Sequence, residues 1–130
     1  MAIPSPNRST LQRLRQGVQQ RFEADLLARV QGAMAAAALG GDAWGVGGYE
    51  VWLFGSRARG DWDGRSDTDL LVVADSQEVA DGLADVLLDA GCGADVIALS
   101  RARWGAMATS EWPHWRGIHQ QARKLLSARP

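Results

Sequence analysis

The feature that most constrains the fold of this chain is a pair of apolar segments. A glycine-serine turn follows the first segment, and two aspartates stand at the start of the second. Residues 49–54 and 67–74 have the length and the β-branched, apolar character of short strands. The first segment ends in Gly55-Ser56, and the second opens with Asp67-Thr68-Asp69 after ten intervening residues. This spacing predicts a tight turn placed beside two carboxylates at the start of a strand.

The residues of the turn are of the types that bind phosphate. Gly55 has no Cβ, so its backbone can approach an anion closely. Ser56 offers a hydroxyl and can open a helix whose free N–H groups point at the anion. Arg57 and Arg59 are cationic and form forked hydrogen bonds with phosphate oxygens, although a salt-bridging role for either is an alternative.

Three aspartates are the candidate metal ligands. Asp67 and Asp69 are two residues apart on the expected strand, so their side chains share a face. Asp95 lies in another apolar segment, residues 94–99, and can lie beside them if the two strands are neighbours. Carboxylates that share the metal with phosphate oxygens suit Mg²⁺ or Mn²⁺, and paired ions of this kind clamp the oxygens of an in-line displacement.

Together these residues resemble the nucleotidyltransferases of the DNA polymerase β superfamily, above all the minimal nucleotidyltransferases. The resemblance covers residues 49–99 well and the flanks loosely. It implies an α/β fold in which a small mixed sheet carries the site and helices cover one face. It also implies transfer of AMP from ATP to a hydroxyl, with Asp67, Asp69 and Asp95 as the catalytic and metal residues. Gly55, Ser56, Arg57 and Arg59 are the implied nucleotide-binding residues.

Many minimal nucleotidyltransferases are antitoxins that add AMP to a tyrosine of a HEPN-domain toxin, so the resemblance implies such a partner. Two alternatives stay open. One is a small-molecule nucleotidyltransferase of the aminoglycoside-modifying type, which usually carries a second helical domain. The other is an antitoxin that only sequesters its partner, against which the intact set of three aspartates argues.

Charge and composition narrow the functional class of the protein further. The net charge of −1, with arginines scattered among acids, argues against a polymerase, and we expect no direct nucleic-acid binding. No apolar run reaches the roughly 18 residues of a membrane span, and the N-terminus lacks a signal-peptide pattern. We therefore expect a cytoplasmic protein.

We expect one domain of 130 residues with four parts. Residues 1–8 form a loose N-terminus, 9–39 a helical segment, 49–99 the catalytic core and 100–130 C-terminal helices. A single helix over residues 10–38 would be about 43 Å long, so either Gly17 or Gly32 marks a break or the helix projects and packs on a partner.

The sequence also predicts several local features. Ser76 caps a helix over residues 77–90 that stops at Gly91, and Pro113 opens a helix whose apolar face reaches Leu125. Cys92 is expected to be an inert thiol. His114 and His119 lack partners at metal-ligand spacing, so we expect packing or surface roles for them. Trp62, in the loop before Asp67, is a candidate for base stacking, partner contact or simple packing.

Overall fold

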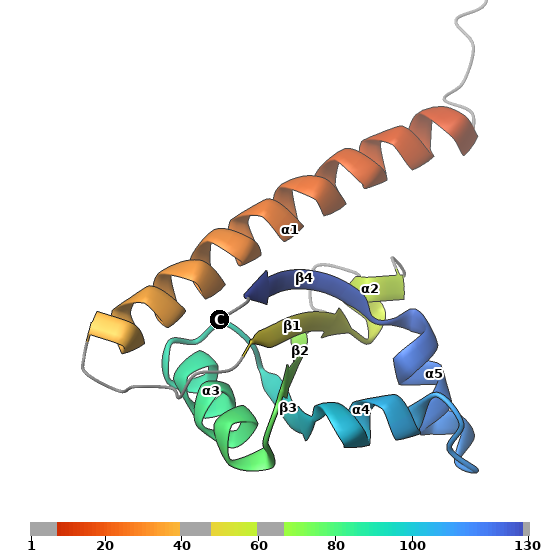
Figure 1. Ribbon diagram of the computed structural model, residues 1–130. Helices are drawn as coiled ribbons and strands as arrows, with labels where there is room; N and C mark the ends of the chain where they lie inside the picture. Colours follow the sequence, from red (N-terminus) through yellow and green to blue (C-terminus); the bar gives the residue numbers. More distant parts are fainter. Residues whose placement is uncertain (1–7, 40–47, 60–66, 129–130) are drawn as a thin grey trace, which may run out of the picture.

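The computed structural model describes residues 8–39, 48–59 and 67–128, and Figure 1 shows their arrangement. The elements in chain order are α1 (Arg8–Leu39), β1 (Tyr49–Phe54), α2 (Ser56–Arg59), β2 (Asp69–Ala74), α3 (Gln77–Asp89), β3 (Asp95–Ser100), α4 (Arg101–Met107), α5 (Pro113–Gln121) and β4 (Arg123–Ala128). The expected α/β fold with a small mixed sheet is confirmed.

The strands form one sheet in the order β3-β2-β1-β4. β1 pairs antiparallel with both β2 and β4, whereas β2 and β3 run parallel. The parallel connection requires a crossover, and α3 supplies it. Because β2 and β3 run the same way, the first residues of both strands lie at one end of the sheet.

The main core lies between the sheet and the helices α1 and α3. Its side chains are contributed by alternate residues of β1 and β2, by the second half of α1 and by the inner face of α3, among them Val51, Leu70, Val72, Leu26 and Leu83. These five side chains are almost completely buried, which makes this layer the chief apolar contribution to stability. Helices on this face were expected.

A smaller core covers the opposite face of the sheet. The intervening residues Leu71 and Val73 of β2 pack there against Met107 of α4 and Ile118 of α5. Trp104 of α4 stacks at 5.1 Å from Trp52 of β1 and at 4.4 Å from His119, between ring centroids. The packing role expected for His119 is thereby confirmed. The C-terminal helices thus cover part of a second face.

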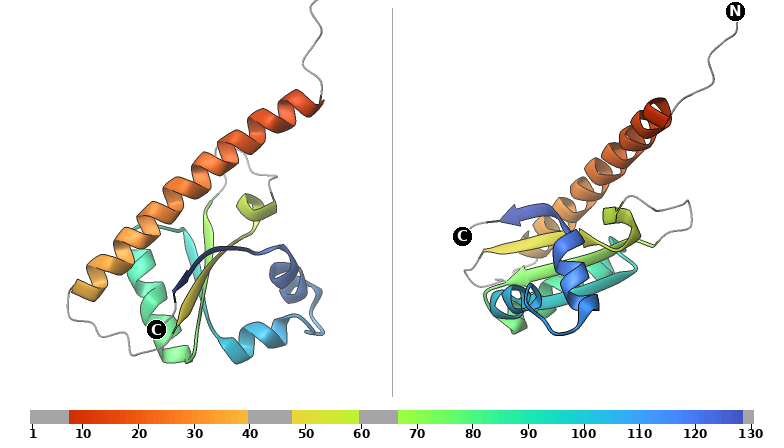
Figure 2. Two further views of the ribbon diagram at one scale, coloured as in Figure 1. Left: turned by 45° about the horizontal axis from the view of Figure 1, so that its top comes forward. Right: turned by 90° about the vertical axis from the view of Figure 1, so that its right-hand side faces the viewer.

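α1 is one uninterrupted helix, so neither Gly17 nor Gly32 marks a break. Leu26, Val30 and Met34 bury its second half against the sheet layer. The first turns run past the edge of the domain, as Figures 1 and 2 show. Leu11 and Leu14 are more than half exposed there. A helix that projects was one of the expected alternatives.

Several local predictions are confirmed. β1 has the expected bounds, and the Ser76 hydroxyl caps α3 by accepting from the backbone N–H of Val79 at 3.2 Å. Gly91 stops the helix with φ +70°, a backbone conformation that L side chains rarely adopt. Cys92 is buried, and this burial raises the pKa of its thiol, as an inert cysteine requires.

The helical assignment of the whole segment 100–130 is wrong at its end. α4 and α5 are helices, but α5 ends at Gln121 and residues 123–128 form β4, which pairs with β1. The expected helix from Pro113 therefore does not extend to Leu125, which belongs to β4. The segment pairs as a strand because β1 would otherwise present an unpaired edge, and sheet pairing outweighs local helix preference.

Residues 1–7 of the expected loose N-terminus lie outside the described part of the chain, and Arg8 already belongs to α1. Among the helices that the structure describes, none has both the length and the apolar character needed to cross a membrane.

Candidate active site

Asp69 and Asp95 open two neighbouring parallel strands and lie directly opposite each other in the register. Side chains of paired residues in adjacent strands project from the same face, which here is the face of the smaller core. The sequence could suggest this juxtaposition only if β2 and β3 were neighbours, and the sheet order confirms that they are. Two carboxylates are thus held side by side at one end of the sheet.

Asp67 lies just outside the strand rather than within it. β2 begins at Asp69, two residues later than expected, because β1 leaves the sheet at Gly55 and offers no partner beyond Phe54. The carbonyl of Thr68 still accepts from the backbone N–H of Ala94 at 2.8 Å, which ties this entry segment to the start of β3. The Asp67 side chain is exposed at the mouth of the site.

Gly55 forms the turn that brings the chain against Asp69. Phe54 is the register partner of Asp69, and Gly55 follows with φ +76°. A Cβ atom at this position would lie 2.5 Å from Oδ2 of Asp69, a separation that real atoms do not tolerate. Glycine is therefore required here both by the backbone angle and by the neighbouring carboxylate.

The short helix α2, which carries the remaining turn residues, is held by α1. The Gln19 side-chain amide donates to the backbone carbonyl of Arg57 at 2.8 Å and to the Glu23 carboxylate at 3.2 Å. The Arg57 guanidinium lies 4.4 Å from the centre of the Phe22 ring, within the range of a cation–π contact. The N-terminal helix thus forms part of the support of the turn.

Sequence reasoning missed this role of Gln19, although a signal was present. Gln19 lies three and seven residues before Phe22 and Leu26, on the apolar face of α1. A polar residue that interrupts an apolar stripe and is buried needs a hydrogen-bond partner. The partner lies 38 residues away in the chain, so only the fold identifies it.

Some of the predicted site lies beyond what the structure describes. The side chains of Ser56 and Arg59 are outside it, and so is the loop of residues 60–66 that contains Trp62. Their predicted roles stay predictions.

The residues present fit a divalent metal ion through two carboxylates. Asp69 and Asp95 are register partners on one face of the sheet, and Mg²⁺ commonly takes one or two carboxylates together with substrate phosphate oxygens. Within residues 8–39, 48–59 and 67–128, no group of three or more His, Cys, Asp and Glu side chains is close enough to hold a metal ion. In this arrangement Asp67 does not join the other two as a third ligand.

Residues 41–104 match the nucleotidyltransferase domain family. The chain carries a nucleotidyltransferase domain. The match contains β1, the Gly55 turn, β2, α3 and β3, the elements that position Asp69 and Asp95. The match supports nucleotide transfer as the general activity of this domain. No curated protein and no solved structure gives a significant match to the chain.

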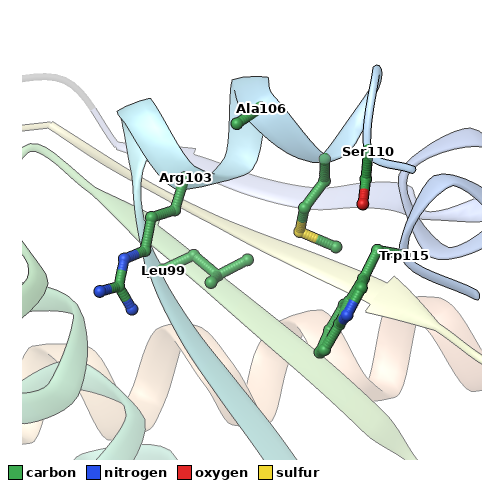
Figure 3. Close-up of a pocket in the computed structure, with 6 residues that line it drawn as sticks. Leu99, Arg103, Ala106, Ser110 and Trp115 are labelled. Carbon is green, nitrogen blue, oxygen red and sulfur yellow. The ribbon is translucent and has the colours of Figure 1, made fainter. Parts of the chain in front are cut away.

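Two hollows lie on the smaller-core face of the nucleotidyltransferase domain. One, of about 240 Å³, lies between the Gly55 turn and α5 and adjoins the site. The other, of about 340 Å³, is lined by side chains that Figure 3 shows around Leu99, with Arg103 at one side and Trp115 at the other. Leu99 and Asp95 are separated by about 13 Å of strand, so the second hollow lies away from the carboxylates.

Proposed function

We propose that this nucleotidyltransferase domain moves AMP from ATP to a hydroxyl of a partner protein, with release of pyrophosphate. The acceptor we favour is a tyrosine of a HEPN-domain toxin, which would make the chain an AMPylating antitoxin of the cytoplasm. The proposal joins the family match over residues 41–104 to the resemblance to minimal nucleotidyltransferases.

The observation that carries the proposal is the juxtaposition of Asp69, Asp95 and the Gly55 turn. Asp69 and Asp95 are register partners across β2 and β3, and the Gly55 turn lies against the Asp69 carboxylate. In our assignment Asp69 and Asp95 hold the metal, Asp95 on the side of the attacking hydroxyl, and Asp67, at the mouth of the site, joins them only when metal and nucleotide bind. Gly55 and Ser56 hold the departing phosphates, with Arg57 and Arg59 in support.

Transfer requires that the acceptor oxygen bonds to the α-phosphorus while the bond to the α,β-bridging oxygen breaks. Pyrophosphate leaves with that electron pair, and the hydroxyl proton passes from the acceptor to solvent. Mg²⁺, when bound, neutralises the phosphate charge and lowers the barrier to this displacement. Asp69 and Asp95 orient the reactants, and the Gly55 turn donates hydrogen bonds to the developing negative charge.

The openness of the site favours a protein acceptor. Asp95 and Asp67 are both exposed, and a phosphoryl-group enzyme gains from excluding water at its reacting centre. A partner seated over this end of the sheet would exclude water and present its hydroxyl at high effective concentration. A small acceptor would leave the same carboxylates open to solvent.

The projecting turns of α1 supply a surface for such a partner. Leu11, Leu14 and Val18 lie on one face of the helix and are 56 %, 63 % and 40 % exposed. Arginines accompany this apolar stripe, and no acidic residue occurs between Arg8 and Phe22. The surface therefore suits a helix with apolar and acidic residues, and its connection to α2 through Gln19 places it next to the phosphate turn.

The test is transfer to a captured partner. The tagged chain is used to isolate its partner from the native cell, and the complex is incubated with ATP and Mg²⁺. We expect the partner to gain the mass of one or more adenylyl groups on tyrosine, and the variant carrying Asp67→Asn and Asp69→Asn to produce no gain while staying folded. Rapid consumption of ATP with a small hydroxylated compound, and no modified protein, would instead establish the small-molecule activity.

A further inference from the structure

The hollow beside the Gly55 turn is continuous with the candidate active site. Its volume is about 240 Å³, and Gly55 and Phe54 form one wall while α5 forms the other. A Cβ atom on Gly55 would lie 2.5 Å from Oδ2 of Asp69, so the turn lies directly beside this carboxylate. A ligand with phosphates on the turn would therefore place an attached group within reach of this hollow. Figure 1 shows α5 beside the end of β1, where the turn begins.

One face of α5 forms the far wall. His114, Gly117, Ile118 and Gln121 all line the hollow, and their spacing of three, four and seven residues puts them on the same side of the helix. Ile118 is buried and provides an apolar floor opposite Phe54. His114 and Gln121 add polar groups near the two ends of the helix, and the His114 ring contacts Trp115 at 5.5 Å between centroids.

This combination fits a nucleoside. A nucleobase has apolar faces that pack on side chains such as Phe54 and Ile118, and polar edges that hydrogen-bond to imidazole and amide groups. The Gln121 side chain offers both donors and an acceptor, as base edges require. A purely apolar hollow would give no such selectivity.

Gly117 keeps the hollow open. It lies in the interior of α5, where glycine is unfavourable compared with alanine. A Cβ atom at Gly117 would meet nothing within 4 Å, so the space above it is vacant. A larger side chain at this position would enter the hollow rather than collide with the backbone of the domain.

The far wall comes from outside the family match. Phe54 and Gly55 belong to residues 41–104, whereas α5 spans Pro113–Gln121. The Gly55 turn and the carboxylates are thus parts of the matched domain, and α5 lies outside the matched range.

We propose that the hollow between the Gly55 turn and α5 binds the nucleoside portion of the triphosphate, and that His114, Gly117 and Gln121 determine which nucleotide is used. This inference rests on the proposed nucleotide transfer and assigns its donor specificity to α5.

The test fills the hollow and compares two ligands. The variant Gly117→Leu and the wild type are titrated calorimetrically with ATP and with inorganic tripolyphosphate, both with Mg²⁺. Gly32→Leu is the matched control, because Gly32 is also a helical glycine with nothing within 4 Å of a Cβ, and it occupies an exposed position of α1. We expect wild type and Gly32→Leu to bind ATP more tightly than tripolyphosphate. Gly117→Leu should lose at least tenfold in ATP affinity and keep its tripolyphosphate affinity.

The outcomes separate the two proposals. Unchanged ATP affinity in Gly117→Leu, or a wild type that binds both ligands equally, overturns the nucleoside pocket while nucleotide transfer stands. Equal losses for both ligands also overturn it, because the substitution then disturbs the phosphate turn. Normal ATP binding with lost transfer would assign the hollow to the acceptor. A wild type that binds neither ligand refutes the nucleotide transfer on which the inference rests.

A second variant tests specificity without filling space. Gln121→Ala removes the amide from the last turn of α5, and its helical fold is checked by circular dichroism. We expect a changed ranking of ATP, GTP, CTP and UTP affinities, with tripolyphosphate binding unaltered. An unchanged ranking would overturn the role of Gln121 in choosing the base.

Discussion

A Cβ atom on Gly55 would lie 2.5 Å from Oδ2 of Asp69, so the Gly55 turn and the first residue of β2 are as close as the chain allows. This short separation brings together the two parts of the predicted motif, the glycine-serine turn and the pair of aspartates. The turn can approach Asp69 only because residue 55 has no side chain, and Asp69 is positioned by its pairing with Phe54. Substitution at either residue should therefore affect both stability and nucleotide transfer.

Gly55→Ala should lower the free energy of unfolding and nearly abolish transfer. The positive φ alone costs an L residue about 1–2 kcal/mol. Gly91→Ala is the control, since Gly91 has φ +70° but nothing within 4 Å of its Cβ. Chemical denaturation should show a larger loss for Gly55→Ala than for Gly91→Ala. Equal losses of unfolding free energy in the two variants would mean that the Asp69 side chain moves away from the new Cβ without cost.

Asp95→Asn should reduce transfer and stabilise the fold. The substitution removes a carboxylate that faces Asp69 across the parallel pair, and opposed like charges destabilise a sheet by roughly 0.2–1 kcal/mol. We expect a loss of transfer of about 100-fold or more, on the scale of losing one group that stabilises the transition state. Asp85→Asn, at an exposed position of α3, should leave transfer unchanged. Full activity of Asp95→Asn would remove this residue from the site.

Gln19→Met should raise the KM for ATP more than it lowers kcat. Methionine retains the shape of the side chain but leaves the Arg57 carbonyl without its donor, which costs about 1–3 kcal/mol when the group is buried. Gln20→Met, at an exposed position of the same helix, is the matched control. Steady-state kinetics and thermal unfolding measure the two effects. A stability loss with unchanged KM would show that Gln19 supports the fold alone.

Glu50→Gln should destabilise the domain by about 1–2 kcal/mol, within the range for hydrogen bonds to a charged group. The Glu50 carboxylate accepts from Trp52 Nε1 at 3.0 Å and forms ion pairs with Arg101 at 3.4 Å and Lys124 at 3.7 Å. This carboxylate thereby joins β1 to β4 and to the start of α4.

The control for Glu50 is Asp25→Asn, which breaks a solvent-exposed pair with Arg29. An exposed pair contributes about 0.5 kcal/mol or less, so this variant should unfold almost like wild type. The difference in free energy of unfolding between the two variants should become smaller in high salt, because salt screens the ion pairs of Glu50. Equal small effects in urea denaturation would contradict a structural role for Glu50.

Cys92 should react with thiol reagents only when the protein unfolds. Burial raises the pKa of its thiol above the ordinary value of 9.0, although Arg29 acts in the opposite direction. A raised folded-state pKa means that the neutral thiol contributes stability below pH 9 and that this contribution is lost as the pH rises through the folded-state value. Labelling rates should therefore follow denaturant concentration at pH 8. Rapid labelling of the folded protein would contradict this prediction.

The sequence determined the features that depend on neighbouring residues. Ser76 caps α3 and Gly91 ends it because capping and a positive φ are properties of a few consecutive residues. The bounds of β1 and the glycine of the turn after it followed in the same way from composition and spacing. The family resemblance rested on the spacing of Gly55-Ser56, Asp67-Thr68-Asp69 and Asp95, and the match over residues 41–104 agrees with it.

Only the tertiary structure decided which distant residues meet. Residues 123–128 have no strong local preference for a strand, and they become β4 because β1 has a free edge for them to pair with. Gln19 and Arg57 are 38 residues apart, and one face of α5 lies beside Gly55 because Ile118 packs in the smaller core. Such contacts depend on burial and on pairing between elements, so no short stretch of sequence encodes them.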